Sequence, residues 1–332
     1  MDIRNIGSLK EAARQRLDEF PNHKRIVLIY SGIALGLTVL VSIVNLLLSL
    51  QISNYGGLSN LGMRSILSTI QTILPVFLTL ALMPLGLGYL AAMLRIARGQ
   101  YTSPQTLRLG FDRFWPLLRL NIVKGLIFSA IGSVCLYAGI SIFMMTPFAQ
   151  PLIELLTPVL TSSTAMTSGF VIDDALAMEI AAAMWPALAI SALVFCFAAA
   201  PVMYQYRMAE YVLIDRPALG ALAVLRESRK MMRGNRLALL RLDLSLWKYY
   251  GGLLIAYLVC YGDQILPALG ISLPFSAGVS YYLFYFAYIV VLFAVYYFLR
   301  NRAEVTLALA YESVKPVEPK QSGVVLGNIF QM

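Results

Sequence analysis

The stretch Arg226–Tyr250, RESRKMMRGNRLALLRLDLSLWKYY, places a strongly basic segment directly before a long apolar run that begins at Gly251. Gly234-Asn235 interrupts the predicted helix, and Arg236 and Arg241 lie between this break and the apolar run. Four earlier cations are spaced i, i+3, i+4 and i+7, on one side of the helix: Arg226, Arg229, Lys230 and Arg233. This pattern predicts a basic amphipathic helix on a membrane surface, followed by a membrane span.

The composition places the whole chain in the same class. Of its 332 residues, 59% are hydrophobic and 13% are charged, and the mean hydropathy is +0.73. Soluble domains carry roughly 25% charged residues. About half that share, together with several apolar runs near the length that crosses a bilayer, predicts an all-α, polytopic membrane helix bundle.

Six apolar runs are long enough to be predicted as transmembrane helices in a single membrane domain, 1–315. They cover residues 26–50, 66–94, 120–145, 185–206, 249–266 and 279–299. Of the 26 Lys and Arg residues, 25 lie in the segments that six spans place on one side, and only Arg64 lies on the other. Cytoplasmic loops carry the excess of Lys and Arg, so both termini are predicted to be cytoplasmic and the protein to lie in the cell membrane.

A recurring plan divides the six spans into three hairpins. Each unit has a helix cap, a short surface helix, a break, cations and then two spans, starting at Ser8, Ser103 and Asp215. We interpret the plan as an internal repeat with three cytoplasmic interfacial amphipathic helices. Between the third and fourth spans, residues 147–184 are predicted to form a long loop, part of which either lies in the membrane interface or re-enters the membrane. The tail, 316–332, is predicted to be mobile.

One stretch carries a family resemblance. Ser228, the run Met232-x-Gly234-Asn235-Arg236 and the run Leu240-x-x-x-Leu244-Ser245-x-Trp247 resemble the hallmark of the DUF975 family of bacterial integral membrane proteins. The N-terminal helix, the closing span and the following helix agree with that family in layout. The chain departs from it at Lys248–Tyr250, where a more apolar continuation is expected. The resemblance implies the class of protein and no activity.

The residues needed for common catalytic and metal sites are scarce. His23 is the only histidine, and the three cysteines, Cys135, Cys196 and Cys260, lie in different apolar runs. The sequence has no Walker A, GxSxG or GxGxxG motif. We therefore expect no enzyme activity, no cofactor and no metal.

Four residues form a possible polar site inside the membrane. Asp263 either faces the bundle, where it would bind a cation or a proton, or belongs to the loop before Pro267. Tyr281, Tyr285 and Tyr288 recur at i, i+4 and i+7. They either line a pocket for a lipid or a peptide or pack against neighbouring helices.

Two functional hypotheses follow. The first is a non-enzymatic accessory or scaffold protein of an envelope transport or stress system, whose cytoplasmic basic face binds anionic phospholipids. The second is a transporter or channel for a small or lipidic solute. Another membrane protein or a second copy of the chain are the candidate protein partners. Nucleic acid is not expected to bind, because the cations lie within a few residues of the spans.

Overall fold

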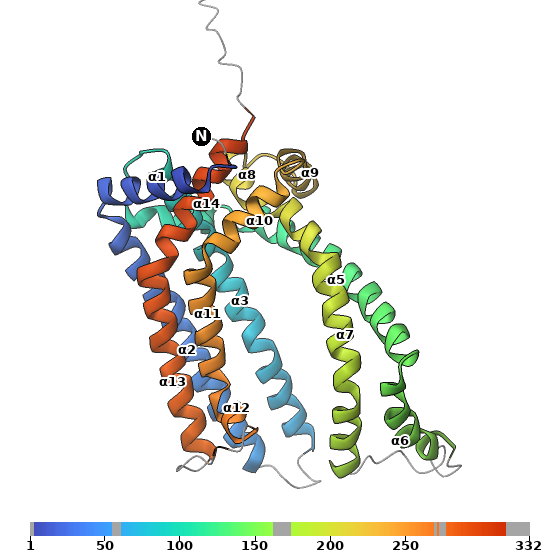
Figure 1. Cartoon of the computed structure of the whole chain (residues 1–332). Coiled ribbons are helices and arrows are strands. Elements are labelled where there is room, and N and C mark those ends of the chain that lie inside the picture. Colours follow the sequence, from blue (N-terminus) through green and yellow to red (C-terminus); the bar gives the residue numbers. More distant parts are fainter. Residues whose placement is uncertain (1–2, 55–60, 162–173, 269–270, 272–276, 317–332) are drawn as a thin grey trace, which may run out of the picture.

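A computed structural model describes residues 3–54, 61–161, 174–268, 271 and 277–316. Every regular element in these residues is helical. Most of the tail predicted from residue 316 onward lies outside the described residues. The helices divide into a group of long ones, which run side by side, and a group of short ones, which gather at one end of the long ones (Figure 1). We call the short group the platform.

Among the described residues, five helices are long and apolar enough to cross a membrane. They are α2 (His23–Asn54), α3 (Leu61–Ala97), α5 (Phe114–Met144), α7 (Asp174–Tyr206) and α13 (Ala277–Val295), the last continued by the π-helix η5 (Tyr296–Arg300). In the membrane these helices need little core between them, because lipid tails solvate their apolar side chains. Many of their large hydrophobic residues are accordingly exposed, such as Phe77, Tyr137 and Phe197.

The predicted segment 249–266 is two shorter helices and not one continuous helix. The chain forms α11 (Trp247–Cys260) and then α12 (Gly262–Ala268), with Tyr261 between them. At the break, the ring of Phe284 occupies the space that a side chain at Gly262 would need. The break therefore lets α13 approach the start of α12 closely. Neither helix is long enough to be counted among the five.

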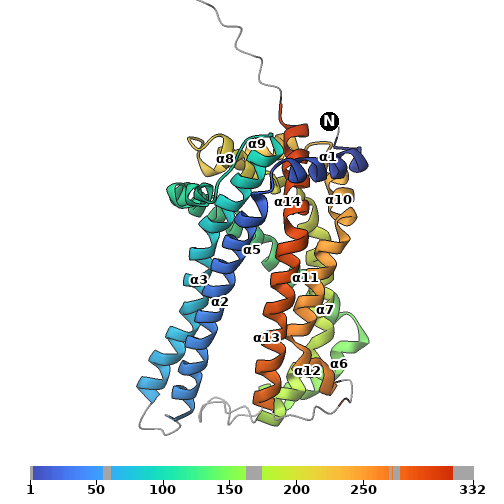
Figure 2. The ribbon, with the colours of Figure 1, turned by 90° about the vertical axis from the view of Figure 1, so that its left-hand side faces the viewer.

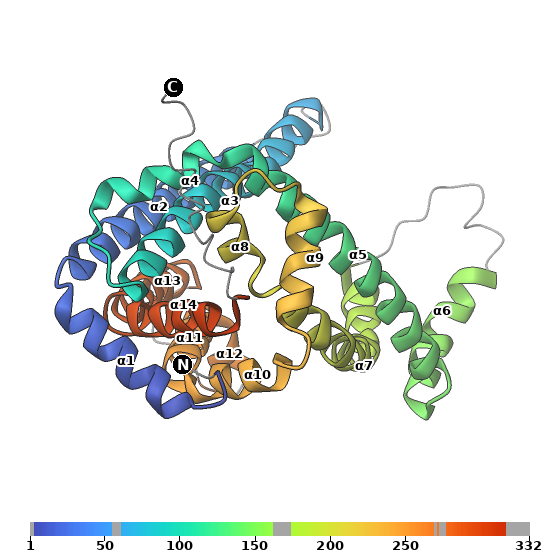
Figure 3. The ribbon, with the colours of Figure 1, turned by 90° about the horizontal axis from the view of Figure 1, so that it is seen from above.

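The platform consists of helices drawn from five separate parts of the chain (Figures 1 and 2). They are α1 (Ile6–Glu19), η2 (Pro104–Arg108) with α4 (Leu109–Asp112), α8 (Ala209–Asp215) with α9 (Ala221–Met231), α10 (Arg236–Ser245) and α14 (Asn301–Val314). Seen from above, they lie over the ends of the long helices, while α5, α7 and α6 (Gln150–Thr161) extend to one side (Figure 3).

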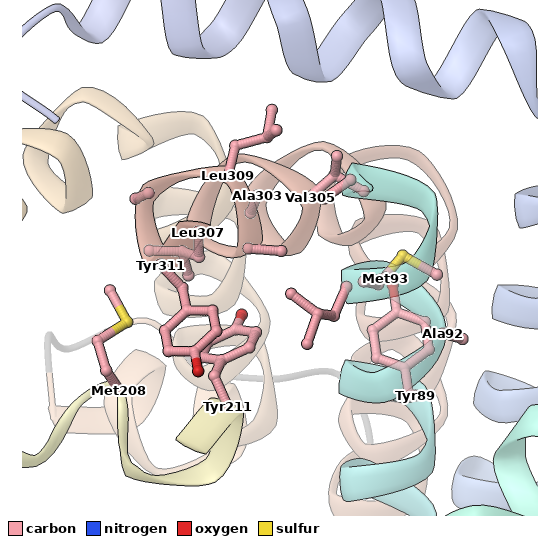
Figure 4. Packing of buried hydrophobic residues seen from close by; sticks show 14 of the residues in the cluster. Tyr89, Ala92, Met93, Met208, Tyr211, Ala303, Val305, Leu307, Leu309 and Tyr311 are labelled. Atoms are coloured by element: carbon pink, nitrogen blue, oxygen red, sulfur yellow. The ribbon is translucent and has the colours of Figure 1, made fainter. Parts of the chain in front are cut away.

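The main hydrophobic core lies in the platform and at the adjoining ends of the long helices. Tyr211 of α8 stacks on Tyr311 of α14 with ring centroids 5.2 Å apart. Figure 4 shows α14 between these rings and the end of α3, where Tyr89 is fully buried. The platform is packed like a soluble domain, because its residues meet water where the long helices meet lipid.

An ion network ties two platform helices to the end of α3. Asp215 at the end of α8 pairs with Arg98, which follows α3, over 2.8 Å, and accepts hydrogen bonds from Tyr311 and Lys315. Arg98 also binds Glu312 of α14 at 2.6 Å. Burial alone would lower the pKa of Arg98, but the hydrogen bonds and charges of Asp215 and Glu312 raise it above its ordinary value. The network fixes α8 and α14 against the end of α3.

Two glycines allow helices to meet at backbone distance. A side chain at Gly88 of α3 would overlap the carbonyl group of Leu107 in η2, and one at Gly110 of α4 would overlap the carbonyl of Pro84 in α3. The platform segment η2–α4 therefore lies directly on the backbone of α3. Only glycine permits this approach.

The long helices associate in pairs: α2 with α3, α5 with α7, and α11 with α13. In the second pair, Gly139 of α5 lies against Ser191 of α7, with no room for a side chain. Away from the platform, this pair diverges from the other long helices (Figure 1).

The local boundaries differ from the sequence predictions in three places. Residues 147–184, predicted as a loop, contain η3 (Pro147–Ala149), α6 and the start of α7. The first helix is capped by Asn5, whose side chain accepts a hydrogen bond from the backbone N–H of Ser8. Asp215 caps no helix, since α9 begins after Gly220.

Candidate functional site

The site lies where the long helices meet the platform. A small cavity of about 140 Å³ is lined by α3, by α8 with the two residues that precede it, and by the junction of η5 and α14. Four charged residues line it: Arg207, Glu210, Arg300 and Glu304. We call it the central cavity.

Two larger cavities adjoin the central cavity on either side. The first, of about 570 Å³, lies between α7 and the α10–α11 junction and shares Arg207 with it. The second, of about 560 Å³, lies between α3 and α5 and shares Gly86 and Glu210 with it. We call these the α7–α11 cavity and the α3–α5 cavity. Together the three form a row of hollows under the platform.

The two outer cavities are mainly apolar. Met203, Leu244 and Leu254 line the α7–α11 cavity. Leu82 and Leu117 are among the residues that line the α3–α5 cavity. The row is therefore apolar at both sides and charged at its centre.

Hydrogen bonds hold the charges on both sides of the central cavity. Lys124 of α5 binds Glu210 of α8 over 2.9 Å. Arg207 donates to the Tyr250 hydroxyl at 3.3 Å, and this hydroxyl donates to Asp243 at 3.0 Å. The first contact joins α5 to α8. The other two join Arg207, which follows α7, to α11 and α11 to α10.

Arg300 lies among three tyrosine rings at the end of the last long helix. Its guanidinium carbon is 4.5 Å from the centroid of Tyr30, 4.9 Å from that of Tyr89 and 4.6 Å from that of Tyr296. The negative faces of the rings attract the cation. Its Nε lies 3.7 Å from Glu304 one turn later. Arg300 is thus fixed at the wall of the cavity.

The central cavity and its borders carry three cations, Lys124, Arg207 and Arg300, and three carboxylates. The carboxylates are Glu210, Asp243 and Glu304. Such a site offers both donors and acceptors for hydrogen bonds.

The basic residues singled out in the sequence lie on the platform. Three of them are exposed on α9, Arg226, Arg229 and Lys230, and Arg233 is exposed in the turn that follows it. The opposite face of α9 is buried, including Val224 and Ser228, which donates to the carbonyl of Gln205 in α7. On α10, Arg241 is exposed, whereas Arg236 is half-buried and its Nε has no hydrogen-bond partner in the described part of the chain.

The predicted intramembrane residues lie at the opposite end of the long helices. Tyr281 and Tyr285 line a cavity of about 570 Å³ between α2, α3 and α13, which we call the tyrosine cavity. The Tyr285 hydroxyl contacts the hydroxyl of Ser42. Neither Tyr288 nor Asp263 lines this cavity. Asp263 lies in the first turn of α12, and among the described residues its Oδ1 has no hydrogen-bond partner.

Sequence reasoning missed the residues of the central cavity. A signal was present, because Arg207 and Glu210 are spaced i, i+3 and Arg300 and Glu304 are spaced i, i+4, each pair at the inner end of an apolar run. Charges at such positions are ordinarily interpreted as residues that reach the membrane surface. Within the described residues, no three His, Cys, Asp or Glu side chains are grouped as metal ligands would be.

Comparison with known proteins gives one finding. The family model described as "Protein of unknown function (DUF975)" matches residues 9–314. No curated protein and no solved structure matches the chain. The family match covers the long helices and the platform alike, including every charged residue of the central cavity. The chain therefore belongs to the DUF975 family.

Proposed function

We propose that this chain is a multi-pass protein of the bacterial cell membrane with six spans in three hairpins and both termini in the cytoplasm. The pairing of α2 with α3, α5 with α7 and α11 with α13 supports the hairpins. In this arrangement α11 and α12 together make the fifth crossing. The platform is the cytoplasmic side, because α1, η2, α4, α9 and α10 come from the segments richest in Lys and Arg.

The function we infer is non-enzymatic binding of a lipid beneath the platform. The observation that carries it is the row of three cavities, apolar at both sides and charged at the centre. An acyl chain of the bound lipid in either outer cavity would contact the cavity walls in place of bulk lipid. A polar head group would find Arg207 and Glu210 at the level where the platform begins, which is the level of the inner-leaflet head groups.

The balance of charge favours a small zwitterionic head group over an anionic one. Glu210 and Glu304 attract an ammonium group, while Arg207 attracts a phosphate. The central cavity, at about 140 Å³, has room for an ethanolamine-sized group. Phosphatidylethanolamine is therefore the probe of choice for this site.

The basic face of α9 adds a second lipid contact in this proposal. Arg226, Arg229, Lys230 and Arg233 would attract anionic phospholipids of the inner leaflet, each by about 1 kcal/mol near such a surface. Lipid bound in both places would anchor the protein as an accessory or scaffold in an envelope transport or stress system. Another membrane protein or a second copy of the chain would be its partner there.

A transporter for a lipidic solute is the second candidate function. One observation favours it: the α7–α11 cavity and the α3–α5 cavity lie on different sides of the central cavity and share its lining residues. A lipid that enters between α7 and α11 would need only to pass Arg207 and Glu210 to reach the other cavity. The tyrosine cavity would then offer a further polar site, with Tyr281 and Tyr285, in the outer half of the membrane.

A cavity-filling substitution tests lipid binding with little risk to the fold. A Cβ at Gly86 would meet no atom within 4 Å, yet Gly86 lines two of the three cavities. The Gly86→Leu side chain is therefore expected to enter the row without a backbone clash. Gly36 of α2 also has open space around it but lines none of the three cavities, so Gly36→Leu is the matched control.

The measurement is the number of phosphatidylethanolamine molecules that the full-length protein retains in a mild nonionic detergent, counted by native mass spectrometry. We expect the unchanged protein and Gly36→Leu to retain one or more, and Gly86→Leu to retain fewer. Equal retention by all three proteins would place the retained lipid elsewhere and refute the proposed site.

A further inference from the structure

A separate pocket of about 430 Å³ lies on the other side of the α10–α11 junction, between α1, α11 and α14. Four cations from three parts of the chain line it: Lys10, Arg14, Lys248 and Arg302. Glu11 is the single acidic residue in its lining. The pocket shares only Trp247 with the α7–α11 cavity and none of its residues with the central cavity.

The walls of this pocket are held together by Lys10. Its amine donates to the backbone carbonyl of Ser245 at 2.6 Å, which joins α1 to the end of α10. The other three cations are exposed, and within the described residues none of them has an ion pair. Three unpaired cations around one hollow repel one another, so an anion between them would relieve that repulsion.

The start of α11 adds to the attraction. This 14-residue helix begins at Trp247, and Leu246 at its N-cap provides no side-chain hydrogen bond. The N–H groups of Tyr249 and Tyr250 donate to the carbonyl of Leu246. Those of Trp247 and Lys248, together with the helix dipole, are therefore the ones that favour an anion. Trp247, 67% exposed, stands beside the cations, as expected of a tryptophan at the level of the lipid head groups.

We propose that this pocket binds a phosphate oxyanion. Arg14, Lys248 and Arg302 would supply the charge-assisted hydrogen bonds, and the start of α11 would supply backbone donors. The phosphate belongs either to an anionic phospholipid of the inner leaflet or to a soluble phosphate compound of the cytoplasm. This site does not depend on the lipid site proposed beneath the platform.

Trp247 provides a local probe. Replacing Trp115 and Trp185 by Phe leaves Trp247 as the single tryptophan, and both replaced side chains are exposed. The full-length protein in a neutral detergent is titrated with chain-brominated phosphatidylglycerol or chain-brominated phosphatidylcholine, which quench tryptophan fluorescence on contact. A third titration adds inorganic phosphate to the protein already quenched by phosphatidylglycerol.

The test variant is Arg14→Gln/Lys248→Gln/Arg302→Gln, which leaves Lys10 in its structural contact. The control, Lys24→Gln/Arg108→Gln/Arg119→Gln, removes the same charge from exposed positions outside the pocket. We expect the protein to prefer phosphatidylglycerol by roughly tenfold or more, the test variant to lose most of this preference, and the control to keep it. Gly251→Leu, which fills the α7–α11 cavity that Trp247 also lines, should keep it too, which separates this site from the one beneath the platform.

The phosphate titration identifies the source of the oxyanion. Recovery of fluorescence at millimolar phosphate would support the site and assign it to soluble phosphate compounds. Persistent quenching, with the preference for phosphatidylglycerol intact, would support the site and assign it to lipid. Equal quenching by the two brominated lipids, or a test variant that keeps the preference, would overturn the proposal.

Discussion

Lys124 of α5 donates a hydrogen bond to Glu210 of α8 over 2.9 Å, and this contact stands at the wall shared by the central cavity and the α3–α5 cavity. The two residues are 86 positions apart in the sequence. Their contact connects the diverging α5–α7 pair to the platform. It also leaves the carboxylate of Glu210 facing the cavity, where a bound cation would meet it.

Glu210→Gln tests both roles of this carboxylate. The side chain of Lys124 is 19% exposed, so losing its partner is expected to destabilise the protein by about 1–2 kcal/mol. Retention of phosphatidylethanolamine should fall as well, because an ammonium group would lose one of its acceptors. The measurements are the thermal midpoint of unfolding in detergent and the lipid count by native mass spectrometry.

Glu19→Gln is the control for this prediction. Glu19 pairs with Arg16 over 2.9 Å, but both side chains are more than 40% exposed. Exposed pairs contribute roughly 0–1 kcal/mol, so neither measurement should change appreciably. If Glu210→Gln behaved like Glu19→Gln in both measurements, the carboxylate would have neither role.

Gly88→Ala and Gly110→Ala are predicted to disrupt the docking of the platform on α3. Each new methyl group would overlap a backbone carbonyl, which cannot move without shifting a helix. We expect the yield of folded protein, measured by fluorescence-detected size exclusion, to drop sharply. Gly86→Ala adds the same methyl group to the same helix in open space and should leave the yield unchanged. Normal yields for all three would mean that η2 and α4 do not lie on α3.

The basic face of α9 predicts stabilisation by anionic lipid. The protein should unfold at a higher temperature in nanodiscs that contain phosphatidylglycerol than in pure phosphatidylcholine, because a ligand of the folded state stabilises it. Arg226→Gln/Arg229→Gln/Lys230→Gln/Arg233→Gln should reduce this difference, and 1 M salt should reduce it in the unchanged protein through screening. A difference that survives both changes would assign the stabilisation to other residues.

Cysteine labelling tests the six spans. In a protein whose three native cysteines are replaced by Ala, Ser65→Cys and Ile271→Cys should react with an impermeant maleimide in intact cells. Glu19→Cys and Gln105→Cys should react only after the cells are opened. Ile271 follows α12, so its labelling decides whether α11 and α12 cross the membrane. Reaction of Ile271→Cys only in opened cells would leave five crossings.

The class of fold was predictable because it depends on composition and on the length of apolar runs. Residues 26–50 lie within α2, and residues 66–94 lie within α3, which includes Pro75 and Pro84. Predicting these two helices does not require knowing which helix packs against which. The helical content and the membrane class therefore follow from local sequence.

Features that depend on contacts between distant segments were not predictable. Asp215 precedes Arg216-Pro217 and has the local pattern of a helix cap, yet its carboxylate pairs with Arg98, which is 117 positions away. The break at Tyr261 coincides with the packing of Phe284 of α13 on Gly262 of α12. A local pattern cannot reveal a partner that lies in another helix.

The candidate site was missed for the same reason. Arg207 and Arg300 each end an apolar run, as many positive residues do, and nothing in either segment indicates that the fold brings them to one cavity. The tyrosines of α13 form a stripe of one residue type, which indicates one helix face. Tyr281 and Tyr285 line the tyrosine cavity, whereas Tyr288 and Asp263 do not.

The most direct test of lipid binding beneath the platform is to map where a photoactivatable phosphatidylethanolamine, with a diazirine in its acyl chain, crosslinks to the full-length protein. We predict adducts at residues of the two outer cavities, such as Met203, Leu254 and Leu82, and their loss in Gly86→Leu and Gly251→Leu. Adducts confined to outward-facing residues such as Leu126 and Phe197, with the same distribution in both variants, would contradict the proposed site.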